Sequence, residues 1–398
     1  MTKWETVQQH IQNAVDNQVI AGASIQIIKD DEIVLNAGFG HDKLDSIYRI
    51  YSMTKVVTVV AVYKLIEKGL LQLTDSVADY LPAFKNHVHY DKNRELALGK
   101  EITIIDLLDM TSGMTYPGLD SPSAIRMKEF EQEVTLKMQS GIQYSTKELM
   151  NLVASVPGEF EAGTQWSYGI SADILGGVIE TVTGQTLSQF FKEQIFNPLG
   201  MSDTGFSVPK EKLDRVSVIT RRHPELQFVE LFDRVGLETN VMNYLTLPFT
   251  YDVHTVDPQF LSGGGGLYST AQDFSKLAQC LLHFGKYSGG QLLQEETIRR
   301  MTQIPDEDPF YSERHEKPVG SGIPGYTYHN LLRILVTPNE AKVLGVSGNV
   351  GEFGWDGAGG NFVVIDPVTN MTIVFMMQDL HFAEPILRRN IYRTIYHS

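Results

Sequence analysis

The 398-residue sequence contains only one cysteine, so the chain cannot form an internal disulfide. This residue, Cys280, lies in an apolar stretch that runs from Phe274 to Leu282. Reactive thiols need polar, partly exposed surroundings. We therefore expect Cys280 to be a buried structural thiol and not a nucleophile.

Positive charge is also scarce. The sequence has 33 lysines and arginines against 48 aspartates and glutamates, which gives a formal net charge of −15. Such a charge repels phosphate backbones and anionic lipid headgroups, so neither nucleic acid nor a membrane surface is expected as a partner. No apolar run approaches the roughly 18 residues that a membrane-spanning helix needs.

The N-terminal segment lacks the apolar core and the cleavage site of a secretion signal. It opens instead as an amphipathic helix, in which Thr2 and Glu5 are placed to form a capping box. From these features we expect a cytoplasmic location.

Hydrophobic residues make up 42% of the chain and charged residues 20%, as is typical of a globular protein large enough for two lobes. Alternating extended segments predict a hairpin near each end, at 23–38 and 362–377. Helical signals dominate between them, and 383–396 is expected to close the chain as an amphipathic helix. We therefore predict an α/β (α+β) fold, in which both chain ends build an antiparallel sheet flanked by helices and a mostly helical lobe is inserted. The expected single domain spans 1–398, with an α/β lobe at 1–70 and 325–398 and a helical lobe at 71–324.

The pair Ser52 and Lys55 is the first candidate for chemistry. Residues three apart share a helix face, so the ammonium could reach the hydroxyl. A helix N-terminus also favours a developing oxyanion. The segment that follows is apolar almost all round as far as Gly69, which predicts a buried central helix. From spacing alone, Ser52 could be a nucleophile or an N-cap.

The same spacing recurs at Ser207 and Lys210. There a proline follows within a short, highly charged segment, so Ser207 is expected to be an N-cap.

Two further segments gain meaning only in combination. Tyr168 stands in a tight loop just before a predicted helix, but an isolated tyrosine is usually a core or surface residue. Five glycines within 351–360 precede a predicted strand. They could let a ligand approach the backbone, or they could mark a bulged edge strand.

Together and in this order, the three segments resemble the serine β-lactamase and penicillin-binding protein superfamily, especially class C β-lactamases and the carboxylesterases of the same fold. Segments 102–114 and 264–274 look like further landmarks of that superfamily. The resemblance implies that Ser52 is acylated, that Lys55 is its partner and that Tyr168 relays protons. It also implies an oxyanion hole made by the N–H groups of Ser52 and Ala358. No cofactor is expected.

The sequence departs from the antibiotic-hydrolysing members at two motifs. Tyr168-Gly-Ile170 replaces Tyr-x-Asn, and Trp355-Asp-Gly357 replaces Lys-Thr-Gly. Ile170 offers no hydrogen bond, and Asp356, if it were ionised and faced the pocket, would repel the carboxylate of a β-lactam. Trp166 and Trp355 are candidate apolar walls for an acyl or alcohol group. The candidate substrate-binding residues are therefore Trp355, Asp356, Gly357, Trp166 and Ile170.

These departures resemble the esterase branch, so we expect a serine hydrolase acting on small or medium esters through an acyl-enzyme. The partner would be a small-molecule ester or amide. A β-lactamase, a D-amino-acid peptidase or amidase, an acyltransferase that uses the same residues and a non-catalytic binding module remain alternatives. The choice of Lys55 or Tyr168 as general base stays open, because such a pair titrates as a unit.

A metal hydrolase is the rival of another class. His87, His89 and Asp91 resemble the start of a dinuclear zinc site. Lys92 occupies the position where a further histidine would be wanted, and the other histidines lack ligand spacing. We expect a solvated loop there and no metal.

Overall fold

The computed structural model describes residues 1–118, 120–222, 228–230, 259–303, 309–310, 323–379 and 384–397. Within them, seven strands form one antiparallel sheet in the order β11-β12-β13-β14-β15-β1-β2. The strands are β1 (Gly22–Lys29), β2 (Glu32–Gly40), β11 (Tyr326–His329), β12 (Leu332–Leu335), β13 (Phe353–Asp356), β14 (Phe362–Asp366) and β15 (Met371–Met377).

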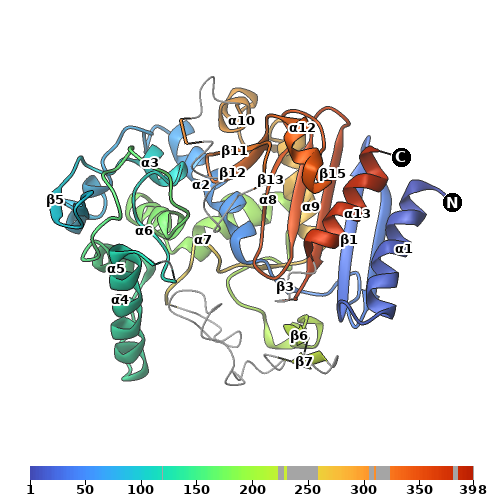
Figure 1. The fold of residues 1–398 in the computed structure, drawn as a ribbon, viewed down its shortest axis with the longest axis horizontal. Coiled ribbons are helices and arrows are strands. Elements are labelled where there is room, and N and C mark those ends of the chain that lie inside the picture. The colour runs from blue at the N-terminus through green and yellow to red at the C-terminus, as the bar shows by residue number, and fades with distance from the viewer. Residues whose placement is uncertain are drawn as a thin grey trace.

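Strands from the two ends of the chain pair with each other inside this sheet. β1 pairs with β15, so that Ala23 lies opposite Met377 and Lys29 lies opposite Met371. Figure 1 shows the blue and red strands side by side, with both termini at the same end of the molecule. The predicted antiparallel sheet built from both chain ends is confirmed.

Helices cover both faces of the sheet. The helices α1 (Lys3–Asp16) and α13 (Glu384–Tyr396) lie on one face, which we call the outer face, and α2 (Thr54–Glu67) and α9 (Ala271–Leu282) lie on the inner face. In β14, Val363 and Ile365 pack into the inner core, whereas Phe362 and Val364 pack into the outer core. A strand with two covered faces needs apolar residues at every position, because successive side chains point to opposite faces.

The rest of the chain adds a helical lobe and short two-stranded ribbons. The remaining α-helices in the described residues are α3 (Ile104–Leu108), α4 (Pro122–Gln139), α5 (Thr146–Val153), α6 (Ser171–Thr183), α7 (Leu187–Phe191), α8 (Asn197–Leu199), α10 (Glu295–Met301) and α12 (Pro338–Ala341), the last of which connects β12 to β13. The ribbons pair β3 (Tyr48–Arg49) with β8 (Tyr268–Ser269), β4 (Val88–Tyr90) with β5 (Leu96–Leu98), β6 (Thr220–Arg222) with β7 (Phe228–Glu230), and β9 (Lys286–Tyr287) with β10 (Gly290–Gln291). None of the described helices is both long and apolar enough to span a membrane.

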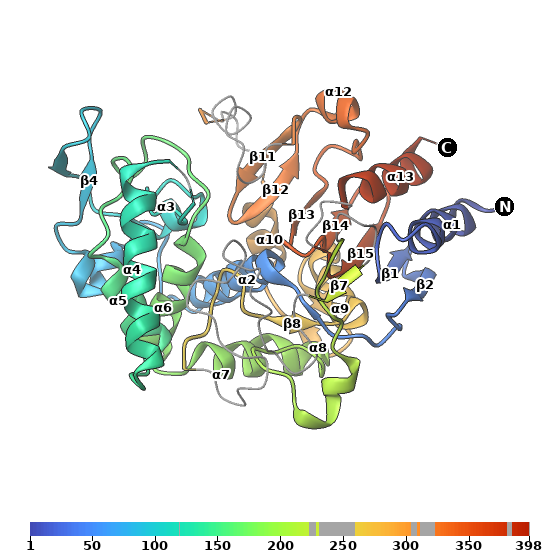
Figure 2. The same cartoon turned by 60° about the horizontal axis from the view of Figure 1, so that its bottom comes forward.

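The central helix α2 lies between the two lobes. Figure 2 shows it with α4, α5 and α6 on one side and the sheet on the other. Its run of valines favours a strand locally, yet burial on all sides stabilises the helix, because tertiary packing overrides propensity. The helix α9, whose residues fall inside the expected helical lobe, packs against β14, β15 and β1.

Two expectations about capping have different outcomes. The Thr2 side chain accepts from the Glu5 N–H while the Glu5 carboxylate accepts from the Thr2 N–H, so the predicted capping box is confirmed. Ser207, in contrast, does not cap a helix. Pro209 takes the cap position of a 3-10 helix at Lys210–Arg215, without a side-chain hydrogen bond. The helix begins at Lys210, so the cap position falls two residues after the serine.

The lone cysteine is buried, as expected. Its burial raises the pKa of the Cys280 thiol to about 12, which keeps the thiol protonated and unreactive.

A buried carboxyl group lies between the sheet and α13. Glu352, just before β13, is 1% exposed, and one of its oxygens accepts from the hydroxyls of Tyr326 (2.9 Å) and Tyr392 (2.5 Å). Burial raises the pKa of Glu352 from 4.5 to about 7, although the two hydroxyls and a neighbouring guanidinium act in the opposite direction.

This raised pKa predicts a pH-dependent stability. The folded protein holds a proton that the unfolded chain releases near pH 4.5, so stability falls as pH rises from about 4.5 to about 7 and is then constant. The free energy of unfolding, measured with urea, should therefore be roughly 2–3 kcal/mol lower at pH 8 than at pH 5 through this group alone. We expect Glu352→Gln to lose this contribution to the difference. The exposed Glu101→Gln serves as the control. An unchanged pH dependence in Glu352→Gln would contradict the assignment.

Candidate active site

A short 3-10 turn at Tyr51–Met53 carries Ser52 into the start of α2. The helix therefore begins at Thr54, two residues later than the serine. Tyr51 adopts φ +44°, a left-handed conformation that a non-glycine residue holds only when its surroundings enforce it. This turn presents the Ser52 side chain, which is partly buried, at the end of the central helix.

Lys55 is fully buried within α2. Its Nζ donates to Ser52 Oγ (3.2 Å), to Tyr116 Oη (3.3 Å) and to the carbonyl oxygen of Gly264 (2.8 Å). Three oxygens therefore surround Nζ, which matches the largest number of N–H donors that a lysine can offer. The amine is thus held against the serine hydroxyl by groups from distant parts of the chain.

The third predicted residue reaches the same serine from the helical lobe. Tyr168 Oη lies 2.9 Å from Ser52 Oγ and accepts from Trp355 Nε1 at 3.3 Å. The Lys55 ammonium lies 4.8 Å from the centre of the Tyr168 ring. The structure therefore brings Ser52, Lys55 and Tyr168 together, and both the amine and the phenol are close enough to exchange a proton with the hydroxyl.

Two further residues of the cluster were not predicted. Tyr116 contacts Lys55, and burial together with the Asp173 carboxylate raises the pKa of Tyr116 well above its usual value. Asp173 accepts from Ser262 Oγ (2.5 Å) and from the Gly264 N–H (3.1 Å). Burial raises the pKa of Asp173, whereas Lys55 acts to lower it. In the sequence, the positions of Tyr116 just after the landmark 102–114 and of Asp173 five residues after Tyr168 were the available signals.

The glycine-rich segment places Ala358 beside this cluster. The Gly357 N–H donates to the Asn361 carbonyl (2.8 Å) and the Gly360 N–H to the Gly357 carbonyl (3.0 Å). The intervening Ala358 N–H makes no backbone hydrogen bond with any residue that the structure describes. A Cβ at Gly357 would lie 2.4 Å from the carbonyl oxygen of Ile50, so only glycine fits there. The loop thus packs directly against the residues that precede Ser52.

The predicted apolar walls lie behind the tyrosine. Trp166 and Trp355 are 1% and 4% exposed, and their rings lie 6.5 and 5.7 Å from the ring of Tyr168. Tyr328 packs edge-on against both tryptophans. These rings support Tyr168, and Trp355 also acts as a hydrogen-bond donor. Ile170 is fully buried in the core at the start of α6, away from a substrate's reach.

Asp356 does not face the pocket. Because neighbouring strand residues point to opposite faces, the inward position of Trp355 sends Asp356 to the outer face. There its carboxylate binds Arg333 and Arg388. Burial raises the pKa of Asp356, but the two guanidinium groups outweigh this effect and hold the pKa below its usual value. The carboxylate is ionised, and the two arginines balance its charge. The suggested repulsion of a substrate carboxylate therefore does not follow.

The histidine segment that resembled a zinc site has other contacts. His87 Nε2 lies 2.9 Å from the Val156 carbonyl oxygen, and burial lowers the pKa of His87. His89 lies in the β4–β5 ribbon. In the described parts of the chain, no group of three or more histidine, cysteine, aspartate or glutamate side chains is arranged to hold a metal ion.

Known proteins are similar to this chain in sequence or in fold. The chain is 25% identical to Protein Rv1367c of Mycobacterium tuberculosis, over 93% of this chain and 89% of the relative. It is similar in fold to EstCE1, described as a hydrolase with promiscuous acyltransferase activity (TM-score 0.77, 21% identity, 98% of both chains covered). It is also similar in fold to the simvastatin synthase LovD of Aspergillus terreus (TM-score 0.77, 22% identity, 100% and 98% covered).

The family comparison covers almost the whole chain. A family model described as Beta-lactamase matches residues 7–396. The match includes the sheet from both chain ends and every residue that meets at Ser52. The protein is therefore a serine hydrolase of the β-lactamase fold and belongs to the beta-lactamase family.

Proposed function

We propose that the protein is a carboxylesterase that cleaves small or medium esters through an acyl-enzyme on Ser52. The observation that carries the proposal is the pair of hydrogen bonds that Ser52 Oγ makes, with Lys55 Nζ at 3.2 Å and with Tyr168 Oη at 2.9 Å. A serine becomes a good nucleophile when an adjacent base can take its proton.

The reaction has two steps. The reaction begins with the Lys55 and Tyr168 pair one proton short, as a neutral amine or a phenolate. Ser52 Oγ attacks the ester carbonyl carbon while its proton passes to this pair, and the N–H groups of Ser52 and Ala358 stabilise the oxyanion. The bond from carbon to the leaving oxygen then breaks, and the departing alcohol takes the proton from the pair. Water next attacks the acyl carbonyl and gives a proton to the pair. The bond from the acyl carbon to Ser52 Oγ then breaks, the acid leaves, and the pair returns the proton to Ser52 Oγ.

The surroundings of the serine favour a neutral ester over a carboxylate-bearing β-lactam or peptide. The residue that contacts Tyr168 from β13 is an indole, Trp355, which carries no charge. The nearby arginines Arg333 and Arg388 are buried on the outer face and bound to Asp356, so they cannot hold a substrate carboxylate. The names of the similar structures, a hydrolase and a synthase, are consistent with acyl chemistry.

The proposal predicts that the purified protein hydrolyses p-nitrophenyl acetate and butyrate and is labelled by a fluorophosphonate probe. Ser52→Ala is expected to abolish both labelling and hydrolysis with an unchanged melting temperature, because the nucleophile is lost and the fold is not. Ser207→Ala removes the other serine of the same spacing and is expected to leave both intact. Hydrolysis that survives Ser52→Ala would refute the proposal.

An acyltransferase is the second candidate, because the same residues serve if an alcohol or amine replaces water in the second step. One of the similar structures, EstCE1, is described as having such an activity alongside hydrolysis. Product analysis with added alcohols distinguishes the two. Nitrocefin and a D-amino-acid amide, run beside esters of increasing acyl length, test the lactamase and peptidase alternatives. A cytoplasmic location is part of this proposal, and cell fractionation would test it.

A further inference from the structure

The strand β13 carries functional groups on both faces. On the inner face, Trp355 donates a hydrogen bond to Tyr168. On the outer face, Asp356 binds Arg388 through both oxygens, at 2.6 and 3.0 Å, and also binds Arg333. Two residues later comes Ala358. The ion cluster of Arg333, Asp356 and Arg388, which we call the arginine clamp, therefore lies on the opposite face of β13 from Trp355, next to the start of the segment that carries Ala358.

The clamp begins where strand pairing ends. On one side, β13 pairs with β12 only at Phe353 and Gly354, opposite Ile334 and Arg333. On the other side it stays paired with β14 as far as Asp356, which lies opposite Phe362. The last two residues of β13 therefore have no ladder partner on the β12 side. Ion pairs of the Asp356 carboxylate take the place of the missing backbone hydrogen bonds between β13 and β12. They connect the end of β13 to β12 through Arg333 and to α13 through Arg388.

Both arginines are deeply buried, with 2% and 4% of their side chains exposed. The guanidinium of Arg388 lies 4.5 Å from the centre of the Phe362 ring, and that of Arg333 lies 5.4 Å from the centre of the Tyr326 ring. Within the described residues, Nη2 of Arg333 has no hydrogen-bond partner. Two buried cations thus share one carboxylate, and moving that carboxylate would weaken the compensation of both charges.

The loop beyond the clamp has little room to move. The Gly357 backbone abuts the Ile50 carbonyl, and a Cβ at Gly359 would lie 3.0 Å from the Tyr51 ring. Asn361 Nδ2 and Gln378 Nε2 both donate to the Arg49 carbonyl, at 2.9 and 2.8 Å. A shift at the end of β13 would therefore be passed to the turn that presents Ser52.

We infer that the arginine clamp positions the oxyanion loop, residues 357–359, and the Trp355 indole against Ser52, so that Asp356 is a positioning residue that acts through Trp355 and Ala358. This inference rests on the proposed ester hydrolysis. Donors of an oxyanion hole work only when they are placed before the reaction, and a displacement of about 1 Å can cost roughly 10²-fold in rate.

Two variants test the inference. Asp356→Asn removes the carboxylate that both buried arginines share. Arg388→Met keeps the ion pair of Asp356 and Arg333 and is therefore the variant more certain to fold. We expect kcat for p-nitrophenyl butyrate to fall roughly 10²-fold in Asp356→Asn and about tenfold in Arg388→Met, with KM within about twofold of wild type. Binding of phenylboronic acid, which forms a tetrahedral adduct on a serine, should weaken in parallel with kcat.

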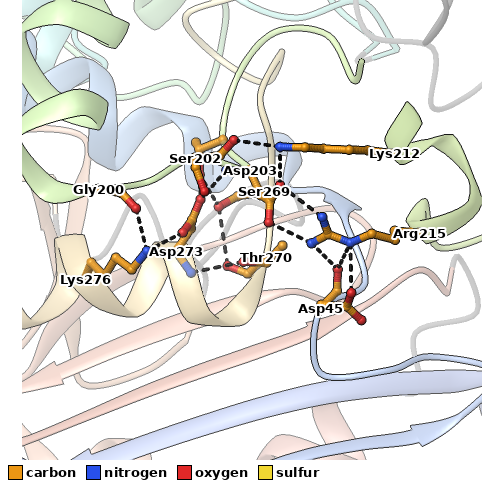
Figure 3. A network of polar contacts seen from close by, with 11 residues as sticks. Asp45, Gly200, Ser202, Asp203, Lys212, Arg215, Ser269, Thr270, Asp273 and Lys276 are labelled. Carbon is orange, nitrogen blue, oxygen red and sulfur yellow. Dashed lines mark hydrogen bonds and ion pairs between the residues drawn. The ribbon is translucent and has the colours of Figure 1, made fainter. Parts of the chain in front are cut away.

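A second aspartate that is bound by two cations supplies the matched control. Figure 3 shows Asp203 between Lys212 (2.7 Å) and Arg215 (2.7 Å), with Arg215 also bound to Asp45 (3.0 Å). This cluster joins the segment after α8 to the loop between β2 and β3 and does not touch β13. Asp203→Asn and Arg215→Met repeat the same chemical changes there. They are expected to lower the melting temperature while kcat and boronic acid affinity stay within about twofold of wild type.

The outcomes separate this inference from the proposed function. Wild-type protein that hydrolyses no ester refutes the proposed function. An active wild type in which folded Arg388→Met keeps its kcat and its boronic acid affinity refutes the positioning role alone. The positioning role would also be refuted if Arg215→Met and Arg388→Met lowered the melting temperature equally and lowered kcat equally. The loss of kcat would then follow from general destabilisation.

Discussion

Replacing Lys55 with methionine is expected to lower the kcat of ester hydrolysis by at least about 10³-fold, because the proton of Ser52 loses its amine partner. Methionine keeps all but the last atom of the side chain's length, but it cannot donate to Ser52, Tyr116 or the Gly264 carbonyl. Substrate binding does not depend on the amine, so KM should change little. Steady-state kinetics with p-nitrophenyl butyrate and the rate of fluorophosphonate labelling measure the effect.

The same helix offers the control. Lys64 is a second lysine of α2, is partly buried and lies far along the helix from Ser52. Its Nζ donates to the Leu292 carbonyl (2.9 Å). Lys64→Met is expected to leave kcat unchanged. If Lys55→Met kept more than a tenth of the wild-type kcat, the amine would have no part in activating the serine.

Removing the phenolic oxygen of Tyr168 is expected to have the next largest effect. Tyr168→Phe retains the ring that packs against Trp166 and Trp355 but loses the oxygen that links Ser52 to the indole. A residue that transfers protons contributes typically 10²–10⁴-fold, so we expect kcat to fall by about that factor while the melting temperature changes little.

Tyr63→Phe is the corresponding control. Tyr63 also lies in α2, and its hydroxyl donates to Asn330 (2.9 Å). Losing this buried hydrogen bond should cost about 1 kcal/mol of stability without altering kcat. A Tyr168→Phe variant with wild-type kcat would show that Lys55 alone handles the proton.

Much of the architecture could be predicted because local patterns agree with the fold. The hairpins at both ends alternate and carry turn residues, and they form β1–β2 and β14–β15. The pair Ser52 and Lys55 and the distant Tyr168 could be found because each follows a recognisable local pattern. Their spacing along the chain also matched a known order.

The remainder depended on contacts that no local pattern encodes. The alternation within β13 indicates that Trp355 and Asp356 point to opposite faces, but only the packing of α13 decides which face is the outer one. Tyr116 joins the site from a loop 61 positions away from Lys55, without any periodicity to mark it. The sequence suggested that Trp355 forms an apolar wall. Its role as a hydrogen-bond donor depends on the position of the Tyr168 hydroxyl in the folded protein.

The pairing of β1 with β15 has a consequence for the order of events during biosynthesis. A nascent chain that has emerged as far as residue 352 already contains Ser52, Lys55 and Tyr168 but neither Trp355 nor Ala358. Until β15 emerges from the ribosome, β1 lacks its central neighbour and the sheet cannot close. We therefore expect Ser52 to become reactive only after translation is nearly finished, so that truncated chains have no hydrolase activity.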